Sequence, residues 1–133
     1  MLHETQIQVR DETNLGEAYH ELMLSFTVPK ITVRELIAER VRMEVDQYNN
    51  SAQDYLHTLV RPSEAEETIN GYRFKERRFV DAEKQVAIAL QAFETNGYFL
   101  LIDDKQVETL NEEIELQQDM VVNFVKLTQL VGG

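Results

Sequence analysis

Hydrophobic and polar positions alternate at the start of the chain. Within residues 4–10, Ile7 and Val9 face one side, and the polar residues between them face the other. A period of two is typical of a half-buried strand, so this segment predicts one. Residues 21–29 alternate in the same way after the polar segment 11–20. Two strands joined by a polar loop predict a hairpin.

A helix over residues 33–48 is the clearest local prediction. Thr32 and Glu35 form a T-x-x-E capping box, and Ile31 and Leu36 are spaced for a hydrophobic staple. Apolar residues then recur at spacings of three and four, which places them on one face of a helix. They are Val33, Leu36, Ile37, Val41, Val45 and Tyr48. The helix is expected to break at Asn49-Asn50.

The pattern is weaker over the next segment. Residues 51–60 suggest a short helix, and residues 61–79 a loop with one short strand. Asp81 is placed to cap a second helix over 82–97, which carries one apolar stripe and ends at an Asn-Gly pair.

The last part of the chain predicts three strands. Residues 98–107 contain an apolar run, a tight Asp103-Asp104 turn and a short return. Residues 108–119 are mostly polar, and 120–130 are β-branched and aromatic, as in a final strand. A helix packed on one face of a mixed sheet is an α+β arrangement. The last strand is expected to pair with the first at the centre of the sheet, with a tail running off it.

Composition limits the kinds of chemistry available. A length of 133 residues favours a single domain over 1–133. The absence of cysteine excludes disulfides, thiolate nucleophiles and cysteine metal ligands. The first ten residues lack a signal-peptide core, and no run reaches the ~18 apolar residues of a membrane span. The cytoplasm is therefore the expected location.

The net charge of -11 argues against nucleic-acid and anionic membrane partners. It fits either a partner with a basic face or an acidic surface that only maintains solubility. The basic cluster in residues 72–79 is expected to pair with neighbouring acids. His3, His20 and His57 lack the spacing of metal ligands, and the acidic run 112–119 is expected to be a solvated loop.

The order of these elements resembles the β-grasp fold of ubiquitin and of the small sulfur carriers of molybdopterin and thiamine synthesis. The resemblance covers roughly residues 4–48 and 98–133. Its specific part is the sequence "DKQVETL" after a strand, then an isolated Ile114 and a final strand before Gly132-Gly133. Ubiquitin has "GKQLE", "TL", an isolated Ile and a strand ending "LRGG" in the same order. The helical insert at about 49–97, between the main helix and the third strand, has no counterpart there.

The resemblance implies a bacterial ubiquitin-like protein modifier, which is a substrate of enzymes and not itself an enzyme. Its tail, residues 128–133, is expected to be flexible. Gly133 would be adenylated by an activating enzyme that uses ATP and magnesium, then passed as a thioester to a conjugating enzyme. It would finally be joined to a target protein by an isopeptide bond, which a deconjugating protease would remove. Gly132 keeps the approach to that carboxylate open, and the protein itself holds no cofactor.

Three tail residues are the expected contacts for the partner enzyme: Gln129, Leu130 and Val131. Leu130 either anchors the tail in an apolar groove or ends the strand and packs locally. Two other functions stay open. One is a sulfur carrier in which Gly133 becomes a thiocarboxylate, and the other is a β-grasp interaction domain that is not conjugated.

Overall fold

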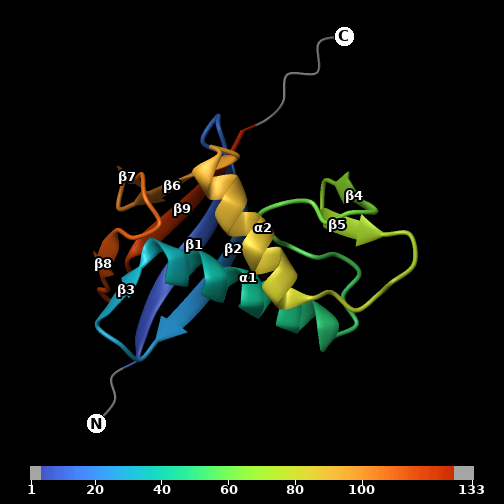
Figure 1. Cartoon of the computed structure of the whole chain (residues 1–133), viewed down its shortest axis with the longest axis horizontal. Helices are drawn as coiled ribbons and strands as arrows, with labels where there is room; N and C mark the ends of the chain where they lie inside the picture. Colours follow the sequence, from blue (N-terminus) through green and yellow to red (C-terminus); the bar gives the residue numbers. More distant parts are fainter. Residues whose placement is uncertain (1–3, 128–133) are drawn as a thin grey trace. The chain divides into compact units, whose positions relative to one another are not determined.

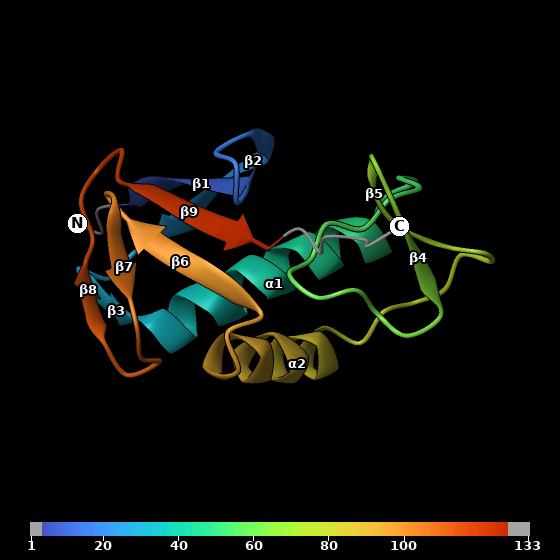
Figure 2. The ribbon, with the colours of Figure 1, turned by 90° about the horizontal axis from the view of Figure 1, so that it is seen from above.

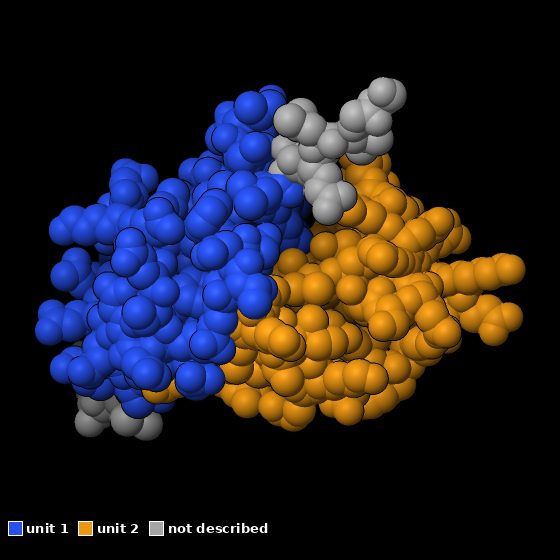
Figure 3. Space-filling view, turned by 45° about the horizontal axis from the view of Figure 1, so that its top comes forward, with its two compact units in different colours: residues 1–34, 93–133 blue, residues 35–92 orange. Residues whose placement is uncertain are grey.

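A computed structural model describes residues 4–127 of the chain, which form an α+β structure. The described residues fall into two compact units, shown in separate colours in Figure 3. Unit 1 comprises the chain up to Arg34 and again from Phe93 onward. Unit 2 comprises Glu35–Ala92. The expectation of a single domain over 1–133 stays a prediction.

Unit 1 is built on a five-stranded mixed sheet with the order β2-β1-β9-β6-β7 (Figures 1 and 2). β9 lies between β1, with which it is parallel, and β6, with which it is antiparallel. The expected pairing of the first and last strands is therefore confirmed. The strands are β1 (Thr5–Thr13), β2 (Ala18–Phe26), β6 (Tyr98–Ile102), β7 (Lys105–Val107) and β9 (Val121–Lys126).

The centre of one face of this sheet is fully buried. Val9 pairs with Val122 across β1 and β9, and Leu100 pairs with Phe124 across β6 and β9. All four of these side chains are 0% exposed, as is Ile7 two residues before Val9. Successive side chains in a strand point to opposite faces, so this row fixes the register of β9 between its two neighbours.

The first hairpin of the sheet is tighter than the sequence suggested, and the second is as predicted. β1 continues to Thr13 and β2 begins at Ala18, so the expectation of a loop over all of 11–20 was wrong. Extension of β1 is supported by its ladder with β9, which reaches Thr13. The predicted turn at Asp103-Asp104 is confirmed, since both residues have positive φ angles (47° and 70°), as a two-residue hairpin of this type requires.

A second, two-stranded sheet in unit 1 sets the start of the first helix. β3 (Lys30–Thr32) pairs with β8 (Glu113–Glu115), with Ile31 opposite Ile114 and both buried. The next two backbone N–H groups, of Val33 and Arg34, donate to the carbonyls of Glu112 and Leu110 at 2.9 and 3.0 Å. The first N–H groups of a helix have no partner within it, so these bonds favour a helix that begins at Val33.

Both predicted helices are present. α1 (Val33–Asn49) and α2 (Ala82–Glu94) begin at or next to their predicted positions. The six apolar residues of the α1 stripe are at most 1% exposed. At the start of α2, the Asp81 carboxylate accepts a bond from the N–H of Lys84 at 3.2 Å, which is the capping geometry expected from the sequence.

The insert at 49–97 is not only helical. Residues 51–60 form no helix, because Leu56 exchanges two 2.9 Å backbone hydrogen bonds with Tyr72 and is thereby held extended. Tyr72 belongs to a hairpin of β4 (Ala65–Thr68) and β5 (Gly71–Phe74), where one strand was expected. The buried Leu56 side chain explains why this segment contains apolar residues without a helical period.

Candidate functional site

The predicted site follows β9, and the structure describes its first part. Lys126, the last residue of β9, pairs with Thr13 of β1 and with Tyr98 of β6. Leu127 comes next and is 48% exposed. The expected contact residues Gln129, Leu130 and Val131 and the expected reactive residues Gly132 and Gly133 lie outside the described residues.

The β1–β2 loop beside this point is held by hydrogen bonds to Thr13. The Thr13 hydroxyl accepts bonds from the N–H groups of Leu15 and Glu17, each at 3.3 Å. The Thr13 N–H donates to the carbonyl of Glu17 at 2.9 Å, and its carbonyl accepts from Gly16 at 3.0 Å. Gly16 has a φ of +84°, which glycine adopts most readily. The loop is thus fixed while the Leu15 side chain is 81% exposed.

Exposed apolar side chains gather around the end of β9. Tyr19 is 48% exposed, and the Lys126 ammonium lies 6.0 Å from the centre of its ring. We call Leu15, Tyr19, Lys126 and Leu127 the tail-exit surface. Sequence analysis did not single out Leu15 or Tyr19, although a leucine between polar residues in a glycine-containing loop was a usable signal.

The face of the sheet opposite the buried row is mixed in character. Three apolar residues are partly exposed on this face. Phe99 and Leu101 lie two residues apart on β6, and Val125 on β9 pairs with Phe99. Towards β2 the same face becomes charged, because Arg10 forms an ion pair with Glu21 at 3.2 Å. An apolar centre with a polar edge is the usual composition of a protein-binding surface.

No protein-family model matches the chain, and no curated protein or solved structure matches it significantly.

The basic cluster at 72–79 is used within unit 2. Arg77 donates to the backbone carbonyls of Gln53 and Ser51 and to that of Tyr48, and its guanidinium lies 4.1 Å from the Tyr48 ring centre. Arg78 donates to the Glu64 carboxylate at 2.6 Å and lies over the Phe74 ring. Pairing with a neighbouring acid is therefore confirmed for Arg78, whereas Arg77 binds the carbonyls at the end of α1.

Arg42 and Glu83 in unit 2 form an ion pair that shifts the pKa of both groups. Arg42 on α1 donates to both carboxylate oxygens of Glu83 on α2, at 2.7 and 3.1 Å. This hydrogen bond lowers the pKa of Glu83 and raises the pKa of Arg42. The pair joins the two helices at the surface and is not part of the tail-exit surface.

Among residues 4–127, no group of three His, Asp or Glu side chains is placed to hold a metal ion. No helix in that range is both long and apolar enough to cross a bilayer.

Proposed function

We propose that the chain is a β-grasp, ubiquitin-like modifier whose Gly133 carboxylate is activated and joined to a target protein. The observation that carries the proposal is the central position of β9, parallel to β1 and antiparallel to β6. A β-grasp sheet has its first and last strands paired in this way. The proposal concerns the diglycine once its carboxylate is free, whether by translation stop or by processing.

The distance from the sheet to the carboxylate suits transfer into an enzyme. Six residues follow Leu127, and an extended chain spans at most ~3.3–3.6 Å per residue, or roughly 20 Å in all. That length lets the carboxylate reach a nucleotide inside an enzyme while unit 1 stays outside. Two terminal glycines lack a Cβ, so the backbone can approach the nucleotide closely.

The expected reaction has three steps. The Gly133 carboxylate attacks the α-phosphate of ATP, which forms an acyl adenylate and releases pyrophosphate. A cysteine thiolate of the activating or conjugating enzyme displaces AMP and forms a thioester. A lysine amine of the target then displaces the thiol to form an isopeptide bond. The enzymes supply magnesium, positioning and electrostatic stabilisation.

The tail-exit surface is the part of unit 1 that an activating enzyme would meet first. Leu15 stands on a loop fixed by Thr13, so its side chain is presented without a large ordering cost. We expect Leu15→Ser to slow formation of the adenylate. Ile69→Ser is the matched control, because Ile69 is 97% exposed but lies on the β4–β5 turn of unit 2.

The test is expression of the chain with an N-terminal tag in cells of its source, beside a variant that lacks Gly132 and Gly133. The proposal expects higher-mass adducts that survive boiling in SDS for the full chain and none for the shortened one. Gly133→Val should also abolish them, because its side chain crowds the carbon under attack. Equal adducts from all three chains would refute the proposal.

Two other outcomes would identify the alternatives. A tail that exchanges one oxygen for sulfur, with no adduct on proteins, would indicate a sulfur carrier. If removal of the glycines alters neither adducts nor any phenotype that depends on the chain, the β-grasp unit is an interaction domain.

A further inference from the structure

A small cavity opens at the edge of the sheet in unit 1, where β7 ends. The ladder between β6 and β7 ends at the pair Leu100–Val107, whereas β6 extends back to Tyr98. Glu108 then leaves the sheet, and its N–H donates to the Glu112 carboxylate at 3.4 Å. β7 therefore does not continue opposite Phe99, and a cavity of about 190 Å³ lies at this edge of the sheet.

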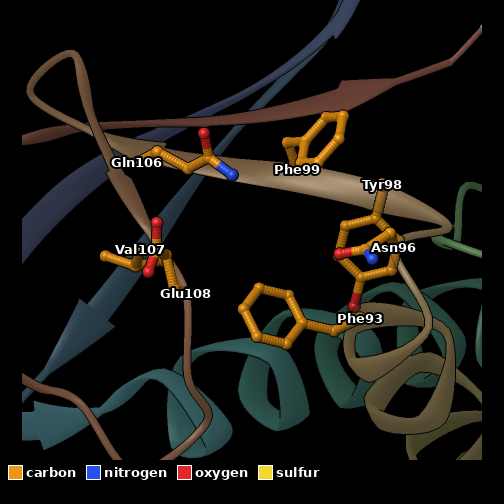
Figure 4. A pocket seen from close by; sticks show the side chains of 7 residues that line it. All are labelled: Phe93, Asn96, Tyr98, Phe99, Gln106, Val107 and Glu108. Atoms are coloured by element: carbon orange, nitrogen blue, oxygen red, sulfur yellow. The ribbon is translucent and has the colours of Figure 1, made fainter.

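Aromatic rings form one side of this cavity. Phe93 on α2 and Tyr98 on β6 form this side, whereas Phe99 lines the cavity from the opposite face of β6 (Figure 4). Phe93 and Tyr98 contact each other with ring centres 6.1 Å apart, and Tyr98 also contacts Phe124 in the core at 6.0 Å. Phe93 and Tyr98 are 7% and 2% exposed. This aromatic side is therefore held rigidly by the core.

Apart from Val107, polar side chains line the rest of the cavity. Gln106 and Glu108 stand on the opposite side of the cavity from Phe93 and Tyr98, and Asn96 lies beside Tyr98 (Figure 4). Within residues 4–127, the Glu108 carboxylate has no ion-pair partner. The side-chain amides of Asn96 and Gln106 likewise have no hydrogen-bond partner in that range. A carboxylate and two amide oxygens are thus available around one aromatic cavity.

The cavity size limits the ligand. Binding sites for small molecules usually measure about 300–1,000 Å³, and this cavity is smaller. That volume suits one long side chain of a partner protein better than a metabolite.

The chemistry of the lining selects a cation with several donors. No Lys or Arg contributes to the lining. Unit 1 carries thirteen Asp and Glu against five Lys and Arg, so its field attracts a basic partner segment. An arginine guanidinium is planar, can stack on an aromatic ring, and donates to carboxylate and amide oxygens at once, whereas a lysine ammonium lacks the planar face.

We propose that this cavity binds an arginine side chain of a partner protein. The Glu108 carboxylate and the amide oxygens of Asn96 and Gln106 accept hydrogen bonds from its guanidinium. The plane of the guanidinium stacks on the ring of Phe93 or Phe99. This proposal does not depend on the proposed conjugation.

The experiment is an NMR titration of the ¹⁵N-labelled full chain with N-acetyl-arginine amide, and with the lysine and norleucine amides for comparison. A single side chain is expected to bind with a Kd on the order of 1–10 mM. Shifts should concentrate at residues 96–99 and 106–108, should be weaker for lysine, and should be absent for norleucine. Equal shifts from norleucine, or shifts spread over the acidic surface, would overturn the proposal.

Three variants test the site further. Glu108→Gln should weaken arginine binding about fivefold, as expected for a solvated ion pair. Glu115→Gln changes the net charge equally but lies on β8, so it should leave binding within experimental error. Asn96→Gly removes an acceptor and tolerates the φ of 62° found there, so the cavity keeps its shape and binding falls about twofold. Equal losses in the two glutamine variants would show long-range attraction only and would contradict the site.

Discussion

The position of β9 can be tested by comparing two phenylalanines on opposite faces of the sheet. Phe124 on β9 is 0% exposed and pairs with Leu100, whereas Phe99, the neighbour of Leu100 on β6, is partly exposed on the other face. The two residues have the same side chain and lie one register step apart. Their expected contributions to the free energy of unfolding therefore differ only because they lie on opposite faces of the sheet.

The expected cost follows from burial. Phe124→Ala removes a fully buried ring, which typically costs ~3–5 kcal/mol, and also the contact of that ring with Tyr98. Phe99→Ala removes a partly buried ring and should cost about 1–2 kcal/mol. With a urea slope of ~2 kcal/mol/M, the difference of roughly 2 kcal/mol corresponds to about 1 M between the two midpoints.

Urea unfolding followed by circular dichroism and tyrosine fluorescence measures these midpoints. The chain contains 5 Tyr and no Trp, so the fluorescence reports on tyrosines alone. Phe124→Leu provides a milder substitution if the alanine variant does not fold, with an expected cost that stays above that of Phe99→Leu. If the Phe99 variants are as unstable as the Phe124 variants, the assignment of the buried face is wrong.

Three further predictions concern backbone conformation, pH and the insert. Gly71→Ala should lower the free energy of unfolding by more than ~1 kcal/mol in urea titration, because φ is +129° and an added Cβ meets atoms at 3.1 Å, whereas Gly16→Ala meets no atom within 4 Å and should cost less. The Arg42 hydrogen bond lowers the pKa of Glu83, so its contribution is present above the usual pKa near 4.5 and is lost as pH falls through the lowered value. The Tm difference between the wild type and Glu83→Gln should therefore vanish in acid, and a difference that persists there would contradict this. Arg77→Lys should destabilise the chain by about 1.5–3 kcal/mol in the same urea assay, because an ammonium cannot bind three carbonyls and stack at once; a cost as small as that of Lys75→Arg would refute it.

Strong local signals in the sequence predicted their elements well. The α1 stripe, the Asp81 cap and the Asp103-Asp104 turn each depend on neighbours in the chain, so a pattern in the sequence was enough. The pairing of the first and last strands was expected from the order of the strands and the main helix, since no local pattern specifies a partner so distant in sequence.

Elements formed by long-range contacts were missed. β8 has three residues and a single apolar one, Ile114, and it becomes a strand through Ile31 of β3. β4 contains Glu66 and Glu67, which have low strand propensity, and it forms through its pairing with β5. Neither the spacing of hydrophobic residues nor the strand propensity of the residues could have indicated these two strands.

The candidate site was predicted unevenly for the same reason. A diglycine after a final strand can be read directly from the sequence. Leu15 and Tyr19 belong to the tail-exit surface only because the ladder of β1 with β9 extends to Thr13. The cavity that we propose binds arginine depends on where β7 stops pairing, which is a property of the ladder and not of any motif.

Conjugation through Gly133 is tested most directly by mass spectrometry of tryptic peptides from proteins that carry the tagged chain. Trypsin cleaves after Lys126, so a conjugated target should retain the seven residues from Leu127 to Gly133 on a lysine amine. Conjugation through Gly133 predicts target lysines that bear this Leu-Thr-Gln-Leu-Val-Gly-Gly branch. Recovery of the tail peptide solely with an unlinked Gly133 carboxylate, from cells in which the chain is active, would contradict it.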